Sequence, residues 1–442
     1  MFTSYKIILS NPFVLVFFIG TVATFFLNHI LEFISWKSRC KNQGKLPSQL
    51  KEISAAQCFD TEKLAKINDY ENAKYFTWIP ASIIGLTVTL GLVFSGFYPW
   101  LFDKVCLLTG NPSGFFSTFL CALLFFVLSS IPETIISIPF ELYNEFKIEK
   151  KFGFSNMTFK MWIQDQIKNI FVSAILMSIL LACIIGILVL FPNTWWIFVT
   201  CILLIFSIIS IVIYPVIIAP MFNKFTPLED GELKERISKL ITELGFKSSG
   251  IFVMDASKRS GHSNAYFGGF GKTKRIVLYD TLINQLTTDE LEAVLGHELG
   301  HYKLKHVTKR LFFLIPTILL MMFLLFLIAQ SQNLYLGFGF YVTPTNISSM
   351  QFIGLFLATF VINALQELLS PILNYNSRKD EYAADKFSAK LTKNPDALIS
   401  GLIKLNCENL SELLPPKIYV IWNYSHPSLI ERITALKKIQ EQ

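Results

Sequence analysis

The sequence predicts a mainly α-helical, multi-pass membrane protein with seven transmembrane helices and a cytosolic part that contains a small β-sheet. The composition is the first observation: of the 442 residues, 52% are hydrophobic and only 16% are charged, whereas about 25% are charged in a typical soluble domain. The second is a set of almost charge-free intervals, each longer than the ~20 residues that cross a bilayer. The third is that nearly all lysine and arginine lies between alternate spans.

Five such intervals supply the seven spans. A turn at 191–196 divides the fourth interval and the polar stretch 331–346 divides the fifth, so each of these two crosses twice. The first span precedes its positive flank, and no small-residue cleavage site follows it, so we expect an uncleaved span and not a signal peptide. The intervals are 7–31, 75–102, 105–132, 169–223 and 311–377, of which only the last holds a charge, Glu367.

Basic residues decide the orientation. With seven spans, 34 of the 39 lysines and arginines fall on one side of the membrane and 2 on the other. Because basic residues stay on the cytosolic side, we expect both large polar segments and the C-terminus in the cytosol. The net charge of +7 then fits contact with anionic lipid headgroups and not nucleic-acid binding. Seven cysteines without a CxxC pair indicate free thiols.

The spans and polar segments divide the chain into four parts. Spans one to five occupy 1–219, the first polar segment 220–308, spans six and seven 309–373, and the second polar segment 374–442.

The two polar segments have distinct element patterns. In the first, helical spacing of apolar residues predicts a helix over 233–244 that Gly245 stops, and β-branched runs predict a small sheet. A capping box of Thr287 and Glu290 starts the next helix, which can continue into the sixth span. In the second segment we expect a helix over 376–392 and a final helix with Pro427 in its first turn. The predicted strands are 251–255 and 275–280.

The stretch AVLGHELGHYKLKH (293–306) predicts a metal site on the capped helix. His297 and His301 are i and i+4 and share one helix face, so both imidazoles can reach one zinc ion. Glu298 lies about 100° around the helix, where it can act as general base on water that zinc activates. The alternative is a polar helix face without metal. We expect Gly300 to allow close approach of another backbone or of substrate.

A catalytic zinc site needs a third protein ligand, and the sequence offers three candidates. His306 lies about 140° from the ligand face of a continuous helix and is interpreted as an interfacial polar residue. Glu381 is favoured, with Asp385 accepting an imidazole N–H; the alternative there is a solvated charged helix face. Glu367, deep in the seventh span, is the rival ligand, and we assign it, with Gln366 and Asn363, to a polar cavity.

Other polar residues suggest how a substrate could bind. Asn264, Ala265 and Tyr266 can form a sheet edge that binds peptide as an added strand, although an ordinary hairpin turn fits the same residues. We expect His262 in a loop or at the surface. His426 and Arg432 flank the start of the final helix, where they either cap it, stabilise an oxyanion or hold Glu381.

Six stretches resemble the integral-membrane CAAX prenyl endopeptidases, which are gluzincin zinc metalloproteases of the a-factor-converting enzyme type. The resemblance runs from the loop after the third span nearly to the C-terminus, and the seven-span layout agrees with it. The stretches are HELGH (297–301), EYAAD (381–385), FNKFTPL (222–228), SNAYFGGF (263–270), EKKFGFSNMT (149–158) and SHPSLIERI (425–433).

The resemblance implies a fold whose spans enclose a water-filled chamber with the site at its cytosolic end. It also implies one zinc ion per chain and assigns site roles. By this resemblance, His297, His301 and Glu381 bind zinc and Glu298 is the general base. Asp385 lies behind a histidine, Asn264 lies on the substrate edge, and His426 and Arg432 lie around the site.

The main hypothesis is a zinc endopeptidase, acting as a monomer, that cleaves C-terminal CAAX-type, prenylated protein or peptide substrates at the lipid bilayer. The alternative is a general quality-control protease that does not require prenylation. An intramembrane protease of the site-two type is a weaker rival, because the HExxH lies among lysines outside the spans, and so is a transporter or scaffold, which needs no HExxH paired with ExxAD. The membrane is expected to be a bacterial inner membrane or that of the endoplasmic reticulum, and the lack of a KDEL-type signal slightly favours the first.

Overall fold

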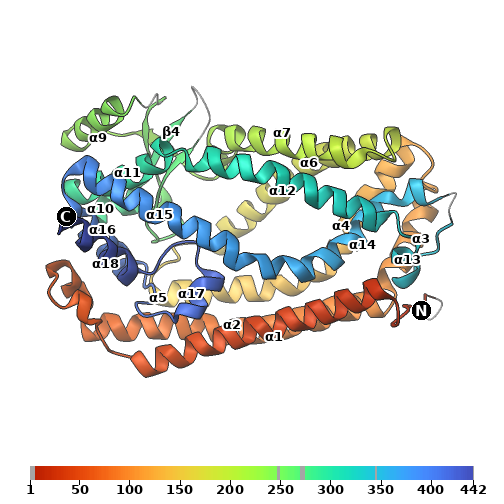
Figure 1. The fold of residues 1–442 in the computed structure, drawn as a ribbon, viewed down its shortest axis with the longest axis horizontal. Helices are drawn as coiled ribbons and strands as arrows, with labels where there is room; N and C mark the ends of the chain where they lie inside the picture. The colour runs from red at the N-terminus through yellow and green to blue at the C-terminus, as the bar shows by residue number, and fades with distance from the viewer. Residues whose placement is uncertain (1–4, 246–248, 269–273, 344–345, 442) are drawn as a thin grey trace.

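The computed structural model describes residues 5–245, 249–268, 274–343 and 346–441. The molecule is an elongated bundle of long helices, with the small sheet and several shorter helices gathered at the end opposite the N-terminus (Figure 1). Among the described residues, six helices are long and apolar enough to cross a membrane, and a pair of helices bent by 48° gives up to seven. The mainly helical, multi-pass class is confirmed.

The membrane helices follow one another along the chain, and two of them are extended by π-helical turns. The segment after α4 stays helical to Phe152 through α5 (Lys150–Phe152), and the segment after α7 stays helical to Phe222 through α8 (Ala219–Phe222). The membrane helices are α1 (Pro12–Asn42), α2 (Thr61–Phe94), α4 (Phe115–Tyr143), α6 (Phe159–Leu190), α7 (Trp195–Ile213), α12 (His306–Ala329) and the bent pair α14 (Gln351–Gln366) and α15 (Ser370–Thr392).

The predicted boundary between the second and third spans, a turn at 103–104, is wrong. Helix α2 ends at Phe94, and a separate short helix, α3 (Phe97–Thr109), precedes α4. Gly96 (φ 75°) and Gly110 (φ 79°) adopt the left-handed conformation that only glycine takes without strain, and they bound α3 on its two sides. The charged pair Asp103 and Lys104, which suggested the turn, lies inside α3, and the residues at the actual turns carry no charge that could reveal them.

The sheet has four strands in the order β1-β2-β4-β3. The two predicted strands are present as β2 (Ile251–Met254) and β4 (Arg275–Tyr279), which pair in parallel. Strands β1 (Phe225–Pro227) and β3 (Ala265–Gly268) pair antiparallel with them and form the two edges of the sheet. The core of this part lies between the sheet and the helices α9 (Glu232–Glu243), α10 (Asp280–Gln285) and α11 (Thr288–Lys303). Strand β3 is therefore an open edge beside α11.

Helix α11 ends at Lys303 and does not continue into the sixth span. Lys305 has a positive φ of 57°, and α12 begins at His306. The last helices are α13 (Gln332–Gly337), which joins α12 and α14, and α16 (Pro395–Glu408), α17 (Lys417–Asn423) and α18 (Leu429–Gln440), which follow α15. Ser428 caps α18 in a capping box, so Pro427 precedes the helix and is not in its first turn as predicted.

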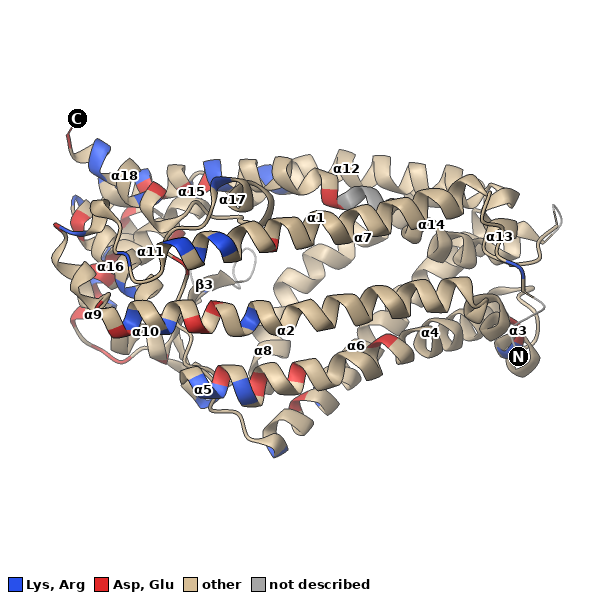
Figure 2. Ribbon diagram, turned by 90° about the horizontal axis from the view of Figure 1, so that it is seen from below, with Lys and Arg blue, Asp and Glu red and all other residues tan. Residues whose placement is uncertain are grey.

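Charged residues collect at the end of the molecule that holds the sheet, α11, α16 and α18 (Figure 2). The opposite end, around α3 and α13, shows few, and most of each long helix between the two ends lacks them. This distribution matches the split of lysine and arginine on which the predicted orientation depends.

Candidate active site

Helix α11 carries both predicted histidine ligands and is fixed at its start and along one side. The capping box forms as predicted: Thr287 Oγ1 accepts the N–H of Glu290 at 3.4 Å, and Glu290 Oε2 accepts the N–H of Thr287 at 2.8 Å. Its apolar side, made of Leu291, Leu295 and Leu299, is buried against the sheet. His297 and His301 consequently face α15.

Glu381 of α15 meets the two histidines. Its Oε2 lies 3.3 Å from His297 Nε2, its Oε1 lies 3.3 Å from His301 Nε2, and the two Nε2 atoms are 3.2 Å apart. Ligands bound tetrahedrally at 2.0–2.1 Å from zinc would be about 3.3 Å from one another. Among the described residues, this is the one group of His, Cys, Asp or Glu placed to hold a metal ion.

The surroundings of Glu381 support the same conclusion. The residue is 3% exposed, and its Oε2 has no hydrogen-bond partner among the described residues. Leaving a buried carboxylate oxygen unsatisfied is costly, whereas a divalent cation between the three donors would satisfy it. The rival ligand Glu367 lies at the bend before α15, about 20 Å away along the helix axis, so it cannot share this site.

Two glycines let α11 and α15 approach closely enough for the three ligands to meet. A Cβ on Gly300 would lie 3.2 Å from the Cα and carbonyl oxygen of Ala384, and a Cβ on Gly296 would lie 2.9 Å from Ser388 Oγ. Ser388 Oγ in turn donates to the carbonyl of Ala293 at 2.5 Å. The expectation that Gly300 allows close approach of another backbone is confirmed, and that backbone belongs to α15.

Asp385 and Arg432 support His297 from behind. Asp385 Oδ1 lies 2.8 Å from His297 Nδ1, and the Arg432 guanidinium, from α18, donates to both Asp385 oxygens at 2.8 and 2.5 Å. A carboxylate at Nδ1 fixes the tautomer that leaves the Nε2 lone pair free for a metal. Arg432 thus helps to position His297, a role that differs from the three the sequence left open, which were capping the helix, stabilising an oxyanion and holding Glu381.

His306 is not the interfacial residue that the helical geometry predicted. It is 3% exposed, and its Nδ1 lies 3.0 Å from His301 Nδ1. The prediction assumed a continuous helix, but the left-handed turn at Lys305 returns the chain toward the site. The sequence offered only one signal, a third histidine five residues after His301.

A cavity of about 120 Å³ opens beside the three ligands. Asn264 and Ala265 line it at the start of the edge strand, together with Glu298 and His426. Tyr266 does not line it: its ring packs against Met254, Val277 and Tyr279. Burial raises the pKa of Glu298, an effect that His297 and His301 oppose. Burial also lowers the pKa of His426, whose Nε2 lies 3.6 Å from Glu381 Oε1.

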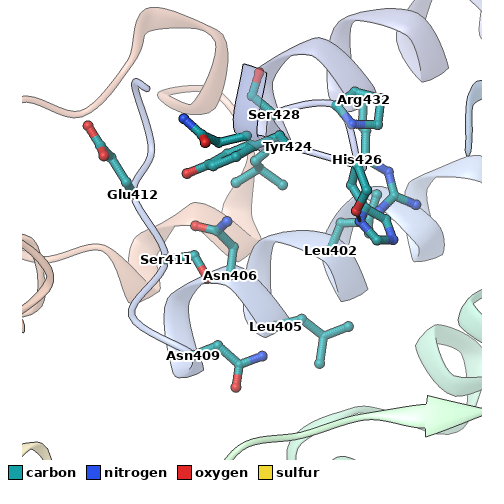
Figure 3. A pocket seen from close by; sticks show the side chains of 14 residues that line it. Leu402, Leu405, Asn406, Asn409, Ser411, Glu412, Tyr424, His426, Ser428 and Arg432 are labelled. Carbon is teal, nitrogen blue, oxygen red and sulfur yellow. Dashed lines mark hydrogen bonds between the residues drawn. The ribbon is translucent and has the colours of Figure 1, made fainter. Parts of the chain in front are cut away.

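A second, larger cavity of about 530 Å³ adjoins the first, because Leu402, Leu405, His426 and Arg432 line both. Figure 3 shows His426 and Arg432 at one end of it and Glu412 at the other, with Asn406 of α16 between them and Asn409, which follows α16, below Asn406. Asn409 Oδ1 also accepts the N–H of Ser263 at 3.3 Å, just before the edge strand. The two cavities together extend from the edge strand across the ligand cluster.

His262 lies in a loop, as expected, and joins two parts of the molecule. Its ring stacks on Phe154 with the centroids 3.9 Å apart, its Nε2 lies 3.2 Å from Glu149 Oε2, and its Nδ1 lies 3.2 Å from Asn409 Oδ1. The loop after α4 is thereby connected to the residues that precede the edge strand.

Two imidazoles and a carboxylate around one point, a second glutamate beside them and a cavity along a sheet edge define the site of a membrane-embedded metallopeptidase. The family model of peptidase family M48 matches residues 227–440. The family model of the N-terminal part of CAAX prenyl proteases, which is described as five membrane helices, matches residues 37–224. The chain belongs to peptidase family M48, among its CAAX prenyl protease members. It is therefore an enzyme, and the transporter and site-two-type hypotheses are rejected.

Curated relatives and a solved structure agree with this assignment. The chain is 38% identical to CAAX prenyl protease 1 homolog of Arabidopsis thaliana over 89% of this chain and 91% of that one. It is 34% identical to CAAX prenyl protease 1 of Saccharomyces cerevisiae over 91% and 90% of the two chains. The crystal structure of S. mikatae Ste24p superimposes with a TM-score of 0.86 at 34% identity, covering 96% of this chain and 99% of that one.

Proposed function

We propose that this protein is a zinc endopeptidase that removes the C-terminal residues of prenylated CAAX-type proteins or peptides. The convergence of His297, His301 and Glu381 at mutual distances of 3.2–3.3 Å carries the proposal. Two nitrogens, one carboxylate and an open side fit a catalytic zinc ion. The names of the relatives, CAAX prenyl protease 1, support the substrate class.

Each site residue has a role in this proposal. Zinc supplies a Lewis acid that polarises the scissile carbonyl and makes water nucleophilic at neutral pH. Glu298 accepts the proton of the attacking water at its carboxylate and returns it to the nitrogen of the leaving amine. Arg432 and Asp385 hold His297, and the His426 imidazole, on the cavity wall, can donate to the carbonyl oxygen as negative charge develops there.

The substrate would bind along the edge of the sheet. Strand β3 is the outer strand, and Asn264 and Ala265 at its start line the cavity beside Glu298. An extended peptide added to this edge passes the ligand cluster and can place side chains in the adjoining 530 Å³ cavity. Tyr266 also belongs to this edge strand, although its ring packs against Met254 and Val277 and does not line the cavity.

The orientation and the environment of the site complete the proposal. The gathering of charged residues at the end that holds the site (Figure 2) supports a cytosolic active site on a multi-pass protein. We retain the four-part division of the chain, the water-filled chamber between the spans and the monomeric state as further parts of the proposal.

A matched pair of peptides tests the proposal. The purified full-length protein would be given one reporter peptide with its CAAX cysteine farnesylated and the same peptide with a free cysteine. Chelator-sensitive, zinc-restored cleavage that prefers the farnesylated peptide is the expected result. Equal rates for the two would favour the alternative, a quality-control protease that does not require prenylation, and cleavage that resists the chelator would contradict the zinc site.

A further inference from the structure

The two ligand histidines have different groups behind them. His297 presents Nδ1 to the carboxylate of Asp385, whereas His301 presents Nδ1 to another imidazole, that of His306, at 3.0 Å. The rings of His301 and His306 are nearly perpendicular, with an interplanar angle of 76° and centroids 5.0 Å apart. The approach is therefore edge to edge between nitrogens and not ring stacking.

Two ring nitrogens 3.0 Å apart share one proton, because each neutral imidazole has one N–H and one lone pair. His301 Nε2 points at His297 Nε2 and Glu381, so its lone pair is needed there and its proton lies on Nδ1. His306 Nδ1 must then accept that proton, which leaves the His306 proton on Nε2. This nitrogen lies on the side of Asp380, 3.6 Å from its Oδ1.

His306 is held in this position by three elements. It is the first residue of α12, and the left-handed conformation of Lys305 turns it back toward α11. Asp380 is the neighbour of Glu381 on α15, and Arg310, one turn along α12, donates to Asp380 Oδ2 at 3.2 Å. With the ring 3% exposed, water has almost no access to replace it as a partner of His301.

We propose that His306 is a positioning residue of the metal site: its Nδ1 accepts the Nδ1–H of His301 and so holds His301 with Nε2 toward the metal. The Asp380 carboxylate, 3.6 Å from His306 Nε2, favours a proton on that nitrogen by its charge, so His306 backs the second ligand as Asp385 backs the first. The inference rests on the proposed metal site, but it concerns a residue that touches neither substrate nor metal.

Zinc affinity of the purified full-length protein, measured by competition with a chelator of known zinc affinity, tests the proposal. His306→Phe keeps an aromatic ring of similar size but has no acceptor, and we expect 10–100-fold weaker zinc binding, the usual effect of losing such a partner. His306→Asn places a carbonyl oxygen close to the position of Nδ1, and we expect it to recover most of the affinity. Val307→Ala, at the adjacent exposed position, is the matched control and should bind as the wild type does.

Cobalt substitution gives a second readout that a loss of stability alone would not produce. The d–d absorption bands of the Co²⁺ protein report ligand geometry, and they should change in His306→Phe and stay close to wild type in His306→Asn. Wild-type affinity in His306→Phe, or equal weakening in both variants, would overturn the positioning role. A wild-type protein that binds no zinc would instead contradict the proposed function, so the two failures are distinguishable.

Discussion

Asp385 Oδ1 lies 2.8 Å from His297 Nδ1, and the same oxygen accepts from Arg432. The carboxylate therefore connects a metal ligand on α11 with α18, near the C-terminal end of the described chain. The Arg432 side chain is only 12% exposed, and Asp385 is its one ion-pair partner among the described residues. A change at Asp385 should consequently affect both metal binding and stability.

We expect Asp385→Asn to weaken zinc binding 10–100-fold, because the amide no longer gives His297 a charged acceptor. It should also lower the apparent melting temperature, since removing one member of a buried ion pair leaves the other charge uncompensated. Zinc competition and thermal unfolding in detergent measure the two effects. Asp230→Asn, which changes an exposed aspartate paired with Lys234, should alter neither quantity.

Glu298→Gln should reduce peptide cleavage by at least 10²–10⁴-fold, the usual contribution of a general base, while zinc remains bound. The glutamine keeps the size of the side chain but cannot accept the proton from water. Parallel measurements of kcat and of bound zinc check both statements. Glu292→Gln, on the same helix but paired with Arg236, serves as the control, and undiminished cleavage by Glu298→Gln would reject the role of base.

Gly300→Ala should separate α11 from α15. The new Cβ would meet the Ala384 backbone at 3.2 Å, and such overpacking costs roughly 1–3 kcal/mol, of which better helix propensity offsets up to about 1 kcal/mol. The displacement would move Glu381, three residues from Ala384, so zinc affinity should fall as well. In Gly91→Ala the Cβ meets nothing within 4 Å; if the two variants behave alike, the close approach is not what the glycine provides.

The stability given by Glu290 should depend on pH. Burial would raise its pKa, but Lys404, Ser400 and the Thr287 N–H lower it below the usual value. A carboxyl whose pKa is lower in the folded state stabilises the fold above its unfolded pKa of 4.5 and loses that contribution as pH falls below it. We expect Glu290→Gln to cost about 1–2 kcal/mol at pH 7.

The matching measurement is a comparison of apparent melting temperatures of Glu290→Gln and wild type between pH 7 and pH 4. The difference between the two proteins should shrink toward the acid end. A difference that is constant over this range would show that the carboxylate charge does not contribute. Glu408→Gln, which alters a more exposed pair with Lys63, should show little effect at any pH.

The sequence predicted the centre of the site because local periodicity is enough to describe it. His297 and His301 share a helix face, and Glu381 and Asp385 repeat the same spacing on a second helix, so two regular helices bring the four together. The small sheet was anticipated by its two β-branched strands, β2 and β4. The edge strands β1 (FTP) and β3 (AYFG) hold a single β-branched residue between them, Thr226, so they leave no such pattern.

The errors arose where a helix ends without an obvious sign. His306 was misplaced because lysine rarely adopts a positive φ, and nothing in YKLKH announces the turn at Lys305. The turns around α3 were missed because charge was taken to mark the limit of a span: the charged pair Asp103 and Lys104 lies inside α3, whereas Gly96 and Gly110, where the chain turns, have no charged neighbour. Tyr266 was expected on the substrate edge and lies in β3, but its side chain does not line the cavity with Ala265, because successive side chains of a strand point to opposite faces.

The short junction between α11 and α12 limits the distance between the proposed metal site and the membrane helix α12. Only Leu304 and Lys305 separate the helix that bears two of the proposed ligands from a membrane helix, so Lys303 and His306 can be at most roughly 10 Å apart when the link is fully stretched. In the proposed orientation, the junction would keep the site next to the membrane end of α12, so we expect a substrate to be brought there, as an attached lipid tail inserted in the bilayer would do.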